Sequence, residues 1–215
     1  MNSETATKCE KEELKCPKCG HVQLWKKYSL INVTEKPDLK EKILKNHVFY
    51  FDCENCDLVA PLTYDSYYLD SKKKLLIVLA PSLTPERREE MKVWEEKKDY
   101  TKRIVDNIND LKEKIMIADN HLDDRVVEMI KIQYLRQLER EMVNDTLLNL
   151  LFDYSGQEMC FIAFFEKKGI GKMPLSMEYY REMEKKYLGQ LKAHSTNSFM
   201  KVDMEWAGNI LFKRH

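Results

Sequence analysis

The chain has 215 residues, of which 43% are hydrophobic and 10% aromatic, so it can form one sizeable globular domain or two small ones. Its 36 basic and 36 acidic residues balance, and no overall field therefore attracts nucleic-acid phosphates or an anionic membrane. The sequence has no apolar run of about 18 residues, and its first residues lack the basic and hydrophobic regions of a signal peptide. We expect a cytoplasmic protein without membrane association.

The predicted elements begin after a polar stretch over residues 1–14, which we expect to be a flexible arm. Alternation of apolar and polar residues predicts a strand over 22–33. A proline followed by apolar positions at helical spacing predicts a short helix over 37–46, and the β-rich residues 47–52 predict a further strand.

The remaining elements follow from the same criteria. Strands are predicted over residues 58–64, 75–80, 100–105, 147–154 and 159–165, and helices over 84–98, 109–118, 122–143, 176–193 and 203–212. Residues 70–74 are predicted to form a hairpin turn and 169–172 a loop. The first 80 residues are thus expected to be mostly antiparallel sheet.

These elements predict an α+β fold in two parts. Residues 15–82 are predicted to form a zinc-ribbon-like antiparallel β module with an inserted short helix. Residues 83–215 are predicted to form an α+β region, either separate from this module or continuous with it, because no low-complexity linker separates the two parts.

Two Cys-x-x-Cys pairs, Cys16 with Cys19 and Cys53 with Cys56, predict a metal site. Each such turn points two sulfurs at one position, and two turns complete a closed tetrahedral shell. The pairs are separated by residues 20–52, more than the roughly 15–20 residues of the commonest ribbon pattern, so an insertion between them is required. A closed shell leaves no position for a substrate, and the predicted metal is therefore structural.

The identity of the metal is predicted from the compartment and the ligands. Six cysteines in this chain are too sparse for a disulfide scaffold, and four thiolates favour Zn²⁺. A rubredoxin-like iron site uses the same two turns and is the alternative. Unliganded or disulfide-bonded cysteines are the competing interpretation of the pairs.

The chain resembles the CpXC family, which is named for two paired-cysteine motifs near the N-terminus. The segment 16–20, Cys-Pro-Lys-Cys-Gly, fits the first motif, and the segments 37–44 and 122–128 resemble further stretches of the family. The second motif departs at Glu54, where proline is expected, and at Asp57, where glycine is expected; aspartate tolerates a left-handed backbone better than most residues. The resemblance covers most of the chain and implies metal binding, without an established activity.

Other cysteines and histidines near these motifs have simpler interpretations. Because four thiolates close the shell, we expect His21 to be a neighbour of the metal rather than a ligand. Cys9 is expected to be a spare thiol on the arm. Cys160, within an apolar run, is expected to be a buried core residue.

Three further segments invite a functional interpretation. Asp123, Asp124 and Arg125 adjoin His121, but acids at a helix start are explained by the helix dipole. The basic run at 72–74 is expected to be a solvated turn. The segment Gly169-Ile-Gly-Lys172 lacks the spacing of a phosphate loop.

Three functions are compatible with these features of the sequence. The first is a non-enzymatic zinc protein, a protein-interaction or regulatory module whose exposed surface binds another protein. The second is a nucleic-acid-binding ribbon, which a net positive charge over residues 8–45, with ten basic and six acidic residues, would favour. We call the turns that carry Cys16 with Cys19 and Cys53 with Cys56 the first and second knuckles. Asp52, Glu54 and Asp57 make the second knuckle acidic, and this acidity repels phosphate. The third is an enzyme or iron redox carrier, for which the sequence shows no converging catalytic groups.

Overall fold

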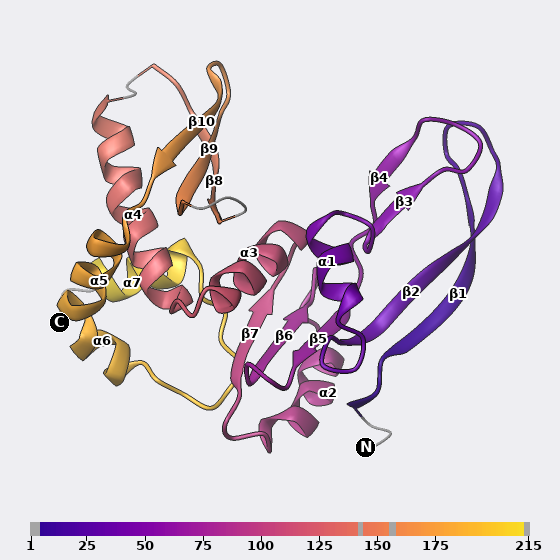
Figure 1. The fold of residues 1–215 in the computed structure, drawn as a ribbon, viewed down its shortest axis with the longest axis horizontal. Coiled ribbons are helices and arrows are strands. Elements are labelled where there is room, and N and C mark those ends of the chain that lie inside the picture. Colours follow the sequence, from indigo (N-terminus) through magenta and orange to yellow (C-terminus); the bar gives the residue numbers. More distant parts are fainter. Residues whose placement is uncertain (1–4, 142–143, 155–157, 213–215) are drawn as a thin grey trace. The chain divides into compact units, whose positions relative to one another are not determined.

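A computed structural model describes residues 5–141, 144–154 and 158–212. These residues form an α+β fold with seven helices and three sheets (Figure 1), which confirms the predicted fold class. None of the helices in the described ranges is both long and apolar enough to cross a bilayer. The chain divides into two compact units, residues 1–112 with 197–200, and residues 113–196 with 201–215. The division predicted near residue 82 stays a prediction.

The first unit is built on a five-stranded sheet with the order β1-β2-β5-β6-β7. Its strands are β1 (Lys8–Lys15), β2 (Val22–Asn32), β5 (Ser66–Asp70), β6 (Leu75–Leu79) and β7 (Thr101–Val105). Two of the pairings, β2 with β5 and β6 with β7, are parallel, whereas mostly antiparallel pairing was expected. The difference arises because helices interrupt the strand order: α1 (Asp38–Leu44) lies between β2 and β5 in the chain, and α2 (Pro85–Glu95) lies between β6 and β7, as parallel connections require.

Two strands of this sheet, β1 and β5, were not predicted from the sequence. β1 lies within the stretch expected to be an arm, and its residues are almost all exposed, so it has no apolar alternation; pairing with β2 along its whole length holds it in place. β5 is buried at all five positions and pairs with β6 across the predicted turn. The strand predicted over 58–64 is limited to β4 (Val59–Pro61), which pairs with β3 (Tyr50–Asp52) in a separate hairpin.

The helix α2 packs its apolar side on this sheet. Met91 is buried, and Trp94 packs against the same cluster, which contains Leu30, Leu76 and Val78 of the strands. The helix begins where the sequence predicts, because the Thr84 hydroxyl accepts a hydrogen bond of 3.2 Å from the backbone N–H of Arg87.

A short segment from the end of the chain completes the first unit. Met200 forms an isolated bridge with Arg103 of β7, and its carbonyl accepts from the Ile104 N–H at 2.9 Å. The buried Lys102 donates its ammonium to the carbonyls of Asn197 (2.7 Å) and Glu95 (3.2 Å). Residues 197–200 therefore serve as an additional edge of this unit.

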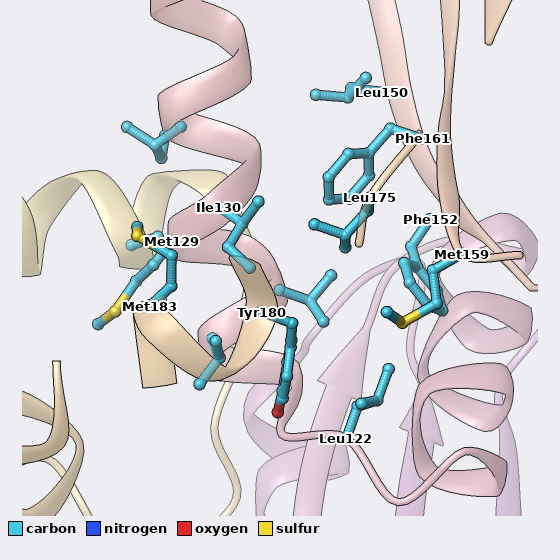
Figure 2. Close-up of a cluster of buried hydrophobic side chains, with 14 of the residues drawn as sticks. Leu122, Met129, Ile130, Leu150, Phe152, Met159, Phe161, Leu175, Tyr180 and Met183 are labelled. Carbon is cyan, nitrogen blue, oxygen red and sulfur yellow. The ribbon is translucent and has the colours of Figure 1, made fainter. Parts of the chain in front are cut away.

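The second unit packs helices against a three-stranded antiparallel sheet with the order β10-β9-β8. Its elements are α3 (Ile108–Asp119, which begins in the first unit), α4 (Asp124–Glu141), β8 (Leu147–Asp153), β9 (Cys160–Phe165), β10 (Gly169–Pro174), α5 (Met177–Lys186), α6 (Leu188–Ala193) and α7 (Met204–Phe212). Apolar side chains from α4, the sheet and α5, among them Ile130, Phe161 and Tyr180, share one core (Figure 2).

Two predictions for this unit need correction. The segment 169–172 is not a loop but the start of β10, which pairs with β9 from Gly169 to Pro174. The helix predicted over 176–193 is two helices, because Tyr187 leaves helical geometry with φ −102° and ψ 11° and ends α5 before α6 begins. The buried Tyr187 side chain explains why the apolar spacing runs through the break.

Candidate metal centre

Two hairpins bring the paired cysteines to one place. The β1–β2 hairpin carries Cys16 and Cys19 in its connecting turn, and the β3–β4 hairpin carries Cys53 and Cys56 in its own. Figure 1 shows the two hairpins extending together from the five-stranded sheet. The four ligand atoms lie within 4.8 Å of one another, although 34 residue positions separate Cys19 from Cys53.

The sulfur positions fit a tetrahedral ion. The Sγ atoms of Cys16 and Cys56 are 3.7 Å apart, and those of Cys19 and Cys53 are 3.6 Å apart. A tetrahedral shell with metal–sulfur bonds of about 2.3 Å has sulfur–sulfur edges of about 3.8 Å. All four cysteines are free thiols, so the disulfide alternative does not apply to this structure. The cluster can hold a metal ion.

Backbone hydrogen bonds shape the first knuckle. The Cys16 N–H donates to the His21 carbonyl at 2.8 Å, and the Gly20 N–H donates to the Cys16 carbonyl at 2.9 Å. Gly20 has φ +76°, a left-handed conformation that costs glycine little and other residues more. This glycine therefore lets the chain turn directly after Cys19.

The side chains of β2 hold the second knuckle against the first. The Gln23 amide donates to the Asp52 carbonyl and accepts from the Glu54 N–H, both at 2.9 Å. The Trp25 indole N–H donates to the Tyr50 carbonyl at 2.9 Å. These three bonds bridge the two hairpins, and they fix the position of the second cysteine pair relative to the first.

The electrostatics of the cluster call for a cation. The His21 N–H, with help from the Asn55 side chain, lowers the pKa of Cys19 to about 6. The Leu58 N–H lowers the pKa of Cys56, but burial and the three neighbouring thiols outweigh it and raise that pKa to about 12. Four adjacent thiols cannot all ionise without a positive charge among them, and a metal ion bound at this cluster would supply that charge.

The family model described as CpXC protein matches residues 14–131. The chain belongs to the CpXC family. The match covers more than half of the sequence and includes both cysteine pairs. No curated protein and no solved structure matches the chain in these comparisons.

The second CpXC motif departs from the family pattern without losing the site. Outside glycine, the described residues with positive φ are Asn46, Phe49, Lys74 and His121. Asp57 is not among them, so the second knuckle turns without the left-handed conformation that its sequence position suggested. Asp57 instead pairs with Lys18 of the first knuckle at 2.5 Å, and this contact lowers the pKa of its carboxyl.

The structure places the other candidate ligands outside the cluster. His21 contributes its backbone and is not part of the group of metal-ligating atoms found in the described residues. Cys9 is exposed on β1, opposite Tyr28 of β2. Cys160 is buried on β9, and burial raises the pKa of its thiol, which opposes a nucleophilic role.

The acidic segment after His121 has structural partners. Asp123 accepts from the guanidinium of Arg125, at 2.6 Å for the closest pair, and its N–H donates to the Tyr180 hydroxyl at 2.7 Å. Asp124 is buried beside Lys114 at 3.4 Å. His121 takes φ +56° where the chain leaves α3. These contacts account for the segment without a substrate.

A buried ion network between α3 and α4 was not predicted from the sequence. Lys114 bonds Glu128 at 2.8 Å, Lys131 lies 3.3 Å from the same carboxylate, and Lys131 also pairs with Glu113. All four side chains are buried. The only available signal was the position of Glu128 and Lys131 inside the run 126–132, whose other members are apolar.

The two remaining segments have roles in the fold. Residues 71–74 form the β5–β6 turn, in which the Asp70 carboxylate accepts from the N–H groups of Lys72 and Lys73. Lys74 pairs with Asp99 at 2.8 Å. Gly169 and Lys172 lie in β10, and a strand offers no cradle of N–H groups for a phosphate.

Proposed function

We propose that this CpXC chain is a non-enzymatic, metal-stabilised protein. Its four clustered cysteines hold a structural Zn²⁺ in a zinc-ribbon-like module, and the module presents a surface to another protein. One observation carries the proposal: four free thiols from two separate hairpins lie within 4.8 Å of one another. A bound zinc ion would neutralise the thiolates and cross-link the hairpins.

The arrangement supports a structural rather than a catalytic ion. All four ligands come from protein side chains, and a shell closed in this way has no position for a reacting water or substrate. Cys16 and Cys53 are buried together with Phe51, and they form the small core of the hairpin pair. The ligands are thus also the packing residues of the module.

Metal analysis tests the ligand assignment. Protein purified without added metal should contain about one zinc per chain, and Cys53→Ser should lose most of it, because three thiolates bind zinc less tightly than four. Cys9→Ser is the matched control, since it removes an exposed thiol outside the cluster and should keep the metal. Equal metal content in the wild type and Cys53→Ser would contradict the proposal.

Iron is the alternative occupant, because the sulfur spacing suits it equally well. An iron site of this kind would give the purified protein a visible absorption spectrum and a reversible redox change, whereas zinc gives neither. A coloured, redox-active preparation whose iron is lost in Cys53→Ser would replace the zinc proposal with a rubredoxin-like carrier.

A further inference from the structure

The β1–β2 hairpin presents one face that the rest of the unit does not cover. Its cross-strand pairs place six side chains together on this side, and we call them the outer face: Lys11, Glu13, Lys15, Val22, Leu24 and Lys26. All six residues are exposed. The opposite side of the hairpin carries Leu14 and Trp25, which pack against the cysteine core.

The outer face exposes two neighbouring aliphatic side chains on β2. Val22 is 51% exposed and Leu24 is 62% exposed. Single exposed apolar residues are common on protein surfaces, but these two lie two positions apart on one strand and therefore point the same way. Covering them with an apolar side chain from another molecule would remove both from water.

Lysines surround these aliphatic residues without acidic partners of their own. Lys15 lies opposite Val22. Lys11 and Lys26 lie opposite each other, on the far side of the Glu13–Leu24 pair. None of the three lysines forms an ion pair with any residue in the described ranges, whereas Lys18 and Lys27 are paired with Asp57 and Glu12. With Glu13 as the one acid on this side, the outer face carries a net positive charge.

The shape and charge of this face point to one class of ligand. We infer that the outer face of the β1–β2 hairpin binds an acidic segment of a partner protein, with an apolar side chain of that segment seated on Val22 and Leu24. The inference rests on the proposed function and names the surface and the partner chemistry. The lysines span about 13 Å along the strands, which matches about four extended residues or about nine helical residues of the partner.

Nucleic acid fits this face less well. Single strands bind through stacking on exposed aromatic rings, and the nearest indole, Trp25, is directed to the other side, where it bonds the Tyr50 carbonyl. Glu13 lies opposite Leu24 in the middle row of the face, where it would repel a backbone that carries a charge at every phosphate, whereas a peptide can place its apolar residue there and its acidic residues beside the lysines. An exposed leucine gains nothing from phosphate contact, but it gains from an apolar side chain.

A library of short random peptides displayed on phage, selected against the full chain with its metal, tests the inference. Enriched peptides should combine Asp or Glu with Leu, Ile or Phe, and their binding should weaken as salt is raised. The triple variant Lys11→Glu, Lys15→Glu, Lys26→Glu should raise their Kd about tenfold or more. Leu24→Asp should weaken binding by a similar factor.

Matched controls separate the face from general effects. Lys98→Glu, Lys185→Glu, Lys192→Glu changes the net charge equally at exposed positions elsewhere and should leave the Kd unchanged. Val93→Asp replaces another exposed aliphatic residue, 72% exposed on α2, and should also be silent.

Three results of the peptide experiment would overturn the inference. They are no enrichment, enriched peptides without acidic residues, and equal binding by the wild type and the outer-face triple variant. Binding of a single-stranded RNA homopolymer at about 0.15 M salt, lost in the triple variant, would assign the face to nucleic acid and overturn it as well. Metal content is measured on the same samples. A zinc-containing chain that binds no peptide would contradict only this inference. A chain that binds peptide without containing zinc would contradict only the proposal that the cysteines hold zinc.

Discussion

The cysteine hairpins and the core of the second unit are stabilised by different means. Around the knuckles, the buried cluster consists of Cys16, Phe51 and Cys53, with partly buried side chains packed around it. In the second unit, twenty described residues form one buried cluster, among them Phe152, Phe161 and Tyr180 (Figure 2). Two of the three buried residues at the hairpins are also candidate metal ligands, whereas the larger core has none.

The difference indicates which region of the chain would need a bound metal ion to stay folded. A large apolar core can offset the entropy lost on folding by itself. A three-residue core cannot, and small modules of this kind commonly rely on a metal. The two regions should therefore respond differently to metal removal and to core substitutions, and the following predictions use that contrast.

Metal removal should have the largest effect, and only on the hairpins. With a chelator, amide exchange in residues 50–61 should accelerate about a hundredfold or more, because structural zinc contributes roughly 10–16 kcal/mol in small zinc modules. Amides of residues 126–132 should exchange at an unchanged rate. Hydrogen exchange followed by mass spectrometry measures both segments in one sample.

The reciprocal control is a substitution in the larger core. Phe161→Ala should lower the free energy of unfolding by about 3–5 kcal/mol, because it leaves a cavity where Phe161 is fully buried. Its metal content should stay that of the wild type. Equal acceleration of exchange in both regions after chelation would mean that the two do not differ as described.

The buried ion network offers a second contrast, through pH. Burial raises the pKa of Glu113 to about 7, although Lys131 opposes this shift. The folded pKa thus exceeds the unfolded value near 4.5, so the folded chain gains stability below about pH 4.5 and loses it as pH rises to about 7. At pH 8, Glu113→Gln should raise the free energy of unfolding, by up to about 3 kcal/mol. Denaturant unfolding at pH 5 and pH 8 measures the change.

Glu128→Gln is the matched control within the same network. Glu128 accepts from Lys114 and lies beside Lys131, so its removal leaves two buried ammonium groups poorly compensated. We expect a loss of about 3–5 kcal/mol, opposite in sign to the effect of Glu113→Gln. If both substitutions destabilise the chain at pH 8, the buried Glu113 carboxylate is ionised at little cost, and the destabilisation inferred from its raised pKa is wrong.

The smallest predicted effect concerns the bond between the hairpins. In the wild type, the rings of Trp25 and Tyr64 are in contact with centroids 5.4 Å apart. Trp25→Phe keeps an aromatic ring at this position but removes the N–H that donates to the Tyr50 carbonyl. We expect a loss of about 1 kcal/mol, seen as faster exchange in residues 50–52. Trp94→Phe, in the sheet cluster of the same unit, should leave exchange in these residues unchanged.

The sequence was sufficient where local chemistry decides the structure. Cysteine spacing predicted the cluster of all four candidate metal ligands, and Thr84 followed by Pro85 marked the start of α2, because a cap and a fixed φ act within one turn. It was insufficient where distant partners decide. β1 has no apolar pattern and depends on β2, and β5 is buried on both faces, so neither displays the period of a half-buried strand.

The buried ion network illustrates the same limit within a single helix. Glu128 and Lys131 lie within the helix predicted over 122–143, and charged side chains at such spacing usually form a solvated surface. Their burial follows from α3, which supplies Glu113 and Lys114 as partners. A single sequence does not reveal which charges a second helix will neutralise.

The bridge between β7 and residues 197–200 has a practical consequence for cutting the chain into pieces. The first unit is not continuous in sequence: it ends at Lys112 and takes back Asn197–Met200. A fragment that stops at residue 131, where the CpXC match ends, would deprive the Lys102 ammonium of the Asn197 carbonyl and the Ile104 N–H of the Met200 carbonyl. Residues 197–200 therefore stabilise the edge of the sheet at β7, and a fragment with the family segment alone would lack this stabilisation.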